Sequence, residues 1–335
     1  MEIRTWIVVY IIKGENMKIT PVLRKRFCKD MNIPINIYQE PYFTERLKLF
    51  DENFRTLWKW ERFKKELEQF KDDQEYLEKY NQIKEAAINF IKESKSYQRF
   101  ISTDLYFKNP NVNYPNDIYK DYNVGEHFVS IDMKQANFNA LRIFEERFCS
   151  DCKSMFNGAK TWKEFISQFT DIEHIIESKY IRQVIFGALN PKRQVAYEKQ
   201  LMLEYLEKVK DDIEKYKLEI AALTNDEIVL KGTEVWMTVF SEEQSKRYPD
   251  MFKYTVFRLF KEEHGLGWFK NISFPYGGGY PEYKCVDVAN YPFILRDQFD
   301  QSVQWYDKVF YHEGRLAMLL EEPKIKWLSE NDWIR

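Results

Sequence analysis

The amino-acid sequence predicts an α+β protein, a mainly helical chain with a small antiparallel sheet. Apolar residues recur at three- and four-residue steps over long charged stretches, which is the spacing of amphipathic helices. A short apolar run at 128–131 and an alternating pattern at 219–230 are typical of strands instead. With 44% hydrophobic residues and only 11 Gly and 11 Pro, the chain can bury a substantial core and lacks the composition of a disordered protein.

The first part of the chain is predicted to be mixed and then helical. Residues 1–50 contain an apolar run at 6–12 that predicts a strand. Residues 51–100 are predicted to be helical, and the charged stretch 54–93 within them would span about 60 Å as one helix, at about 1.5 Å per residue. A compact domain favours an antiparallel helix pair that bends near Lys71–Gln74. The Asn-, Pro- and Tyr-rich stretch 104–127 predicts a loop.

The remainder alternates strands and helices. Asn190 and Pro191 begin a helix, because Asn is a good N-cap and Pro suits the first helical position. The expected elements are the strand at 128–131, a helix at 134–148, a helical block at 159–189, a helix from 191 to about 217, the hairpin 219–230, a helix from about Ser241, a glycine turn at 274–280 and a helix at 301–322. The glycine turn is interpreted as a bend between strands in preference to a nucleotide-facing loop.

Composition limits the compartment and the partners. Four Cys in 335 residues do not form a disulfide framework, which indicates a cytoplasmic protein, or one in the host cytoplasm if it is viral. Cys149 and Cys152 form a CxxC without a second pair, so helical cysteines are favoured over a structural zinc.

The N-terminal apolar run is too short to cross a bilayer, and we expect no membrane partner. Met17 is an alternative start, with residues 1–16 as a translated leader. The net charge of −2 gives no overall attraction to nucleic acid, so such a partner needs local basic patches.

Two acidic positions stand at strand ends. Asp132 follows the apolar run 128–131 and precedes a helix, and Asp226 lies at the tip of the hairpin 219–230. If these strands pair, the two carboxylates converge, and oxygen ligands of this kind suit Mg²⁺ or Mn²⁺. Taken alone, each position has a structural alternative: Asp132 could cap the helix that follows it, and Asp226 with Glu227 could belong to an ordinary polar turn.

Between them lies a basic stretch. Residues 178–199 carry five basic residues against one acid, Glu198. Ser178, Arg182 and Phe186 are four residues apart and share a helix face. Arg182 could hold a triphosphate and Phe186 could stack on a base. The alternative is a surface Arg beside a core Phe.

The order of these elements resembles the palm and fingers of family A DNA polymerases, over roughly residues 128–232. The first motif of the family keeps Asp132 and Gln135 in "DMKQANF". The second keeps Arg182, Phe186 and Gly187, and the third is "NDE" at 225–227 followed by "IVL". Ser178, Asn190-Pro191, Asn225 and Asn137 stand where the family has Arg, Tyr-Gly, His and Glu.

The resemblance implies a right-hand-like polymerase core with a small antiparallel palm-like sheet. Asp132 and Asp226 would bind two Mg²⁺ (or Mn²⁺) ions, and Glu227 would support them as a further catalytic residue. The nucleotide-binding residues implied are Arg182 and Lys179 for the phosphates, Phe186 for the base or sugar, Gln135 near the primer terminus and Asn137 at the sugar 2′-position. The regions expected are an N-terminal segment (1–50), a helical thumb-like region (51–127), a palm-like part (128–150 and 215–260), fingers-like helices (151–214) and a C-terminal region (261–335).

The function expected is that of a minimal nucleotidyltransferase, of viral or mobile-element type, which extends a nucleic-acid 3′ end. Its partners would be nucleoside triphosphates and a DNA or RNA primer or template. Two alternatives stay open: a nucleic-acid-binding protein derived from the polymerase fold that no longer polymerises, and a helical interaction protein in which the motif matches are accidental.

Overall fold

The computed structural model describes residues 19–105, 113–149, 154–261 and 268–272, and the backbone of the strands 282–285, 309–312, 315–319 and 325–327. The side chains of residues 52 and 53 are not among those described. The apolar run at 6–12, Met17, Cys152 and the glycine turn at 274–280 lie outside the described residues.

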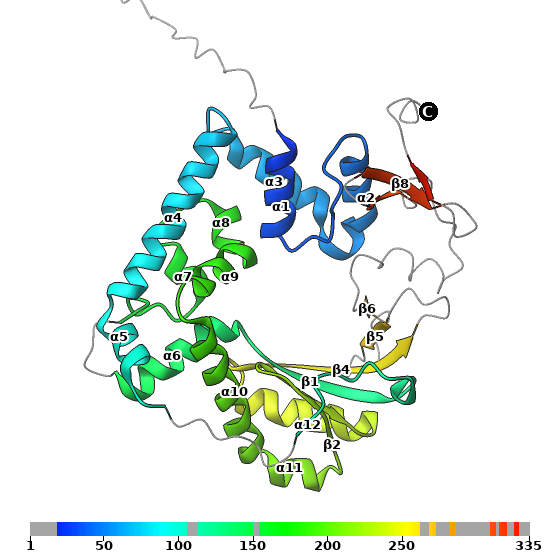
Figure 1. Ribbon diagram of the computed structural model, residues 1–335. Helices are drawn as coiled ribbons and strands as arrows, with labels where there is room; N and C mark the ends of the chain where they lie inside the picture. Colours follow the sequence, from blue (N-terminus) through cyan, green and yellow to red (C-terminus); the bar gives the residue numbers. More distant parts are fainter. Residues whose placement is uncertain are drawn as a thin grey trace, which may run out of the picture.

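One part of the molecule is helical (Figure 1). It is built from a segment that precedes strand β1 (His127–Met133) in the sequence and from a second segment that follows β1 and precedes strand β2 (Glu219–Leu223). Its helices are α1 (Pro21–Asp30), α2 (Tyr42–Phe54), α3 (Thr56–Leu67), α4 (Asp73–Glu93), α5 (Lys95–Ser102), α7 (Trp162–Ile166), α8 (Glu173–Glu177) and α9 (Lys179–Gly187). Thr20, Asp72, Ser94 and Ser178 begin α1, α4, α5 and α9, each accepting a hydrogen bond from a backbone N–H three residues later. Phe27, Trp60 and Phe63 form the aromatic centre of this part, with ring centroids 4.8–5.6 Å apart.

The other part is built on an antiparallel sheet in the order β2-β3-β1-β4-β5-β6. Its elements are η1 (Asp121–Asn123), β1 (His127–Met133), α6 (Ala136–Phe148), α10 (Pro191–Lys208), α11 (Lys210–Lys215), β2 (Glu219–Leu223), β3 (Glu227–Lys231), α12 (Glu234–Arg247), β4 (Phe252–Lys261), β5 (Trp268–Ile272) and β6 (Glu282–Cys285). The first four strands and their helices give a split β-α-β-β-α-β arrangement, with β1 in the middle.

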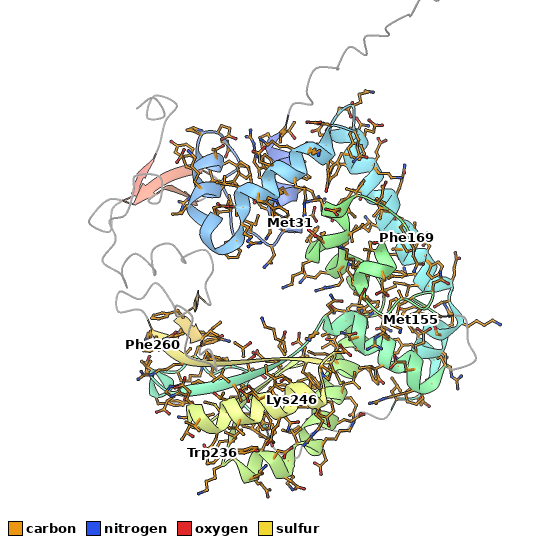
Figure 2. The ribbon with its side chains drawn as sticks, turned by 180° about the vertical axis from the view of Figure 1, so that it is seen from behind. Met31, Met155, Phe169, Trp236, Lys246 and Phe260 are labelled. Atoms are coloured by element: carbon orange, nitrogen blue, oxygen red, sulfur yellow. The ribbon has the colours of Figure 1, made fainter. Side chains whose placement is uncertain are left out.

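The two faces of β1 have different surroundings. Val129, Ile131 and Met133 belong to the main core, which also includes residues of α6, α10 and α12. Phe128 points to the opposite face and joins a smaller cluster with Ile118 and Phe257. In Figure 2 the labelled Trp236 and Lys246 lie on α12 on one side of the sheet, and Met31 lies in the helical part on the other. We call the face that carries Phe128, Ser130 and Asp132 the far face of the sheet.

A buried carboxylate connects four helices of the helical part. Asp30, at the end of α1, is 1% exposed. Its Oδ1 accepts hydrogen bonds from the Tyr80 hydroxyl at 2.8 Å and the Ser178 hydroxyl at 2.7 Å, and its Oδ2 lies 3.0 Å from His174 Nε2. These partners come from α4, the N-cap of α9, and α8, so one side chain fixes the positions of all four helices.

Most predicted elements agree with the structure. The α+β class is confirmed, and β1, α6 and the β2-β3 hairpin match their predicted ranges. The helix predicted from 191 to 217 is present as α10 and α11, and the bend near 71–74 falls between α3 and α4.

Several other predictions were wrong. Residues 309–312 and 315–319 of the expected helix 301–322 are strands β7 (Val309–His312) and β8 (Arg315–Leu319). They form a second antiparallel sheet in the order β7-β8-β9, where β9 is Ile325–Trp327. Helix α12 begins at Glu234 instead of near Ser241, and the segment 1–50, predicted only as mixed, contains α1 and most of α2. None of the helices among the described residues combines the length and apolar character that crossing a membrane requires.

Replacing Asp30 by Ala should destabilise the protein by about 3–5 kcal/mol, because it leaves the buried side chains of Tyr80, Ser178 and His174 without their hydrogen-bond partner. The free energy of unfolding from urea titration measures this loss. The exposed Asp211 on α11 provides a matched control, and Asp211→Ala should change stability by less than about 0.5 kcal/mol. Equal effects of the two substitutions would contradict the role assigned to Asp30.

Candidate active site

Pairing of β1 with β3 brings three acidic residues to the same end of two neighbouring strands. Asp132 is directly opposite Glu227 in the antiparallel register. The next residue, Met133, donates its backbone N–H to the carbonyl oxygen of Asp226 at 2.8 Å. The carboxylates that the sequence placed 94 residues apart are therefore on adjacent backbone positions of one sheet.

The turn before β3 is fixed by Thr224. Its backbone N–H donates to the Glu227 carbonyl at 2.9 Å, and its hydroxyl accepts the Glu227 N–H at 3.1 Å. The same hydroxyl lies 3.4 Å from Asp226 Oδ1. Asn225 is exposed at the tip of this turn. A short turn bonded in this way holds Asp226 in a defined place at the end of the strand.

The acids lie in different surroundings. Asp132 is exposed on the far face, whereas Asp226 and Glu227 are half-buried. The Ser130 hydroxyl donates a hydrogen bond to Glu227 Oε1. Since Ser130 precedes Asp132 by two residues on β1, Ser130, Asp132 and Glu227 share the far face.

A fourth acid, which sequence reasoning did not assign to the site, approaches Asp226 from α10. Glu198 is only 3% exposed, and its Oε1 accepts a hydrogen bond from Asn137 Nδ2 at 3.2 Å. Burial, and secondly the negative charge of Asp226, raise the pKa of the Glu198 carboxyl to about 7, although the hydrogen bond from Asn137 acts in the opposite direction. The sequence did contain a signal that could have identified Glu198: it is one helical turn from both Gln194 and Met202, and all three lie on the buried face of α10.

Asn137 and Gln135 border the site on the α6 side. The amide of Asn137 is directed to Glu198, so this residue of the implied nucleotide set contacts α10. Gln135 is exposed, has a left-handed backbone with φ 47°, and accepts the N–H groups of Phe138 and Asn139 on its carbonyl oxygen. It therefore forms the bend between β1 and α6 and leaves its side chain at the surface.

The predicted residues of α9 are not beside the carboxylates, because α9 packs mainly against α1 and α4. Lys179 is exposed in its first turn. Burial lowers the pKa of the Arg182 guanidinium, whose buried Nε has no hydrogen-bond partner within the described part of the chain.

The nucleotide-stacking role predicted for Phe186 is wrong for this structure. Its ring is 1% exposed, with centroids 5.6 Å from Trp162 and 6.4 Å from Phe156. Such a ring offers no free face to a base. The alternative considered from the sequence, a core Phe, is the one observed.

The carboxylates can be tested against the metal that the resemblance implies. Among the described residues, no group of three or more His, Cys, Asp or Glu side chains has an arrangement suited to holding a metal ion. Mg²⁺ is usually held by one or two protein carboxylates together with substrate phosphates, and not by a closed protein cage. If such an ion arrives with a phosphate-bearing substrate, Asp132 and Asp226 are the residues that would hold it.

Glu198→Gln should flatten the dependence of stability on pH. The folded-state pKa of about 7 lies above the ordinary value of 4.5, so the native state is favoured below pH 4.5 and this advantage is lost as the pH rises to 7. The amide of Gln keeps an oxygen for Asn137 but carries no charge. In metal-free buffer the variant should equal the native protein at pH 4 and be more stable at pH 8 by up to about 3 kcal/mol.

Urea unfolding at a series of pH values measures the effect, and Glu207→Gln, at an exposed position of the same helix, is the control. A native protein whose stability stays constant relative to Glu198→Gln from pH 4 to 8 would contradict the assignment.

Comparison of the chain with family models, with curated proteins and with solved structures finds no match. The functional argument therefore starts from the arrangement of Asp132, Asp226, Glu227 and Glu198 in the sheet and its neighbouring helix.

Proposed function

We propose that the protein is a nucleotidyltransferase that extends a nucleic-acid 3′ end with nucleoside triphosphates, using Mg²⁺ or Mn²⁺. The observation that carries the proposal is the register of β1 against β3, which sets Asp132 opposite Glu227 and next to Asp226. The resemblance of the three motifs to family A polymerases supports the same assignment.

Each acidic residue has a separate role in this proposal. Asp132 and Asp226 hold two cations, which when bound activate a hydroxyl, polarise a phosphate and neutralise the departing pyrophosphate. Glu227, oriented by Ser130, adds negative charge to the far face. Glu198 and Asn137, which are hydrogen-bonded to each other, border the site on the α10 side.

The far face also offers a cation to a nucleic-acid backbone. Asp132 is paired with Lys253 on the other neighbouring strand, β4, and the Lys253 side chain is exposed. Lys270 lies farther along the same face, with its Nζ 4.4 Å from the centre of the Phe257 ring. Because directly paired residues of antiparallel strands share a face, both cations project on the side of the carboxylates. A phosphate backbone that follows β4 would meet Lys253 beside the acidic site.

Primer extension tests the enzymatic proposal. The full chain is incubated with a labelled primer, with or without template, and with each dNTP or NTP in Mg²⁺ or Mn²⁺. Asp132→Ala and Asp226→Ala should each lower incorporation at least about 100-fold, because loss of a metal ligand removes several kcal/mol of charge stabilisation. Asp171→Ala, at an exposed position before α8, should leave incorporation unchanged. Product formation that survives both active-site substitutions would refute the proposed mechanism.

A second candidate, a nucleic-acid-binding protein without polymerase activity, has its own support. Phe186 is a core residue, and the Ser178 hydroxyl donates a hydrogen bond to Asp30. Two positions of the family's second motif therefore have structural contacts in this protein and do not face a nucleotide. A binder would form no extension product and would keep its nucleic-acid affinity in Asp132→Ala and Asp226→Ala. Its affinity would fall as log salt rises, which a helical interaction protein with accidental motif matches would not show.

A further inference from the structure

A pocket of about 350 Å³ lies between α1, the segment that follows it and α9. Residues with different chemistry line it, among them Lys29, Asn32, Ile33, Tyr38, Tyr180 and Gln183. Pockets that bind small molecules begin at about 300 Å³, so this one is large enough for a single ring system with a small substituent.

One side of the pocket is apolar and aromatic. Ile33 and Ile35 are 5% and 4% exposed and form a fixed apolar wall, and Tyr38 and Tyr180 are half-buried beside them. Burial raises the pKa of Tyr38 to about 12, so its hydroxyl stays protonated at neutral pH and can donate a hydrogen bond. Walls of this kind accept a flat ring.

The polar groups are at the rim. Asn32 and Gln183 are exposed, and each amide has both a donor and an acceptor for the edge of a heterocycle. Asn32 has φ 52°, the left-handed conformation in which Asn commonly ends a helix, and so turns the chain from α1 into the pocket wall.

The mouth of the pocket is positively charged. The Lys29 Nζ and the Arg26 guanidinium each lie 5.2 Å from the centre of the Tyr180 ring. The nearby carboxylate, Asp30, faces the interior, where it accepts hydrogen bonds from Tyr80 and Ser178. Lys29 lines the pocket, whereas the Arg26 guanidinium lies 4.4 Å from the Tyr80 ring, so Lys29 supplies the positive charge at the pocket in a chain whose net charge is −2.

We propose that this pocket binds a nucleotide unit, with the base against Ile33, Tyr38 and Tyr180 and the phosphate at Lys29. The unit is a free nucleoside monophosphate or one residue of a single strand, which have the same recognition chemistry. The site is separate from the carboxylates of the sheet. Tyr180 and Gln183 of α9 line the pocket, whereas Phe186 is buried and does not, so the pocket is also distinct from the nucleotide contacts implied for Phe186.

Binding to the full chain tests the site. Isothermal titration with AMP and with UMP, and fluorescence anisotropy with a labelled ten-residue oligothymidylate, distinguish the free nucleotide from the strand. Lys29→Glu and Tyr180→Ala should each weaken binding at least about tenfold, the first through phosphate repulsion and the second through loss of a stacking surface. Lys25→Glu makes the same charge change at an exposed position of α1 that does not line the pocket, and should weaken binding less than threefold.

Two further measurements test whether the binding occurs at this pocket and requires the nucleotide base. The Asp132→Ala, Asp226→Ala double variant should bind AMP or the oligonucleotide like the native protein, whether or not the chain extends primers. Inorganic phosphate alone should bind at least tenfold more weakly than the preferred nucleotide. The proposal is overturned by absence of binding to every nucleotide probe, by equal effects of Lys25→Glu and Lys29→Glu, by phosphate affinity equal to that of the nucleotide, or by loss of binding in the double variant.

Discussion

The register of β1 between β3 and β4 is the constraint on which the candidate active site depends. Val129, Ile131 and Met133 are buried against the helices, and the intervening Ser130 and Asp132 face the opposite side. A shift of one residue would turn Asp132 into the core and expose Ile131, so hydrophobic burial sets the position of the acid. The N–H of Met133 bonds to the Asp226 carbonyl at 2.8 Å, which joins this register to the β2-β3 turn. The chemistry proposed for the site is thus a consequence of ordinary strand packing.

Asp30 is a second constraint, which acts on α9. Its carboxylate accepts hydrogen bonds from Tyr80 and Ser178 and contacts His174, so the start of α9 is tied to α1, α4 and α8. The pocket beside Lys29 lies between the same α1 and α9. A buried charge is costly unless several donors compensate it, and here the same hydrogen bonds connect the two helices that border the pocket. The two candidate sites therefore rest on independent interactions in separate parts of the fold.

The sequence predicted local features of the protein well and non-local ones poorly. The strand that ends at Asp132, the helix after it and the hairpin around Asp226 all follow from periodicity and turn residues within a short window. The partnership of Glu198 with Asn137 and Asp226 depends on how α10 docks on α6, which periodicity does not contain. In the C-terminal region, apolar residues at three- and four-residue steps favoured a helix at 301–322, although Gly314 lies between two aromatic or apolar runs that form β7 and β8.

The orientation of α9 explains why motif spacing alone misassigned Phe186. Spacing shows that Ser178, Arg182 and Phe186 share a face, but it does not show whether that face is directed to solvent or to the core. In the structure Ser178 bonds to Asp30 and Phe186 packs on Trp162, so both ends of this face are turned inward. Lys179 and Gln183 are exposed instead. If α9 contacts a nucleotide in this protein, the contact must therefore be made by Tyr180 and Gln183, which line the pocket together with Lys29.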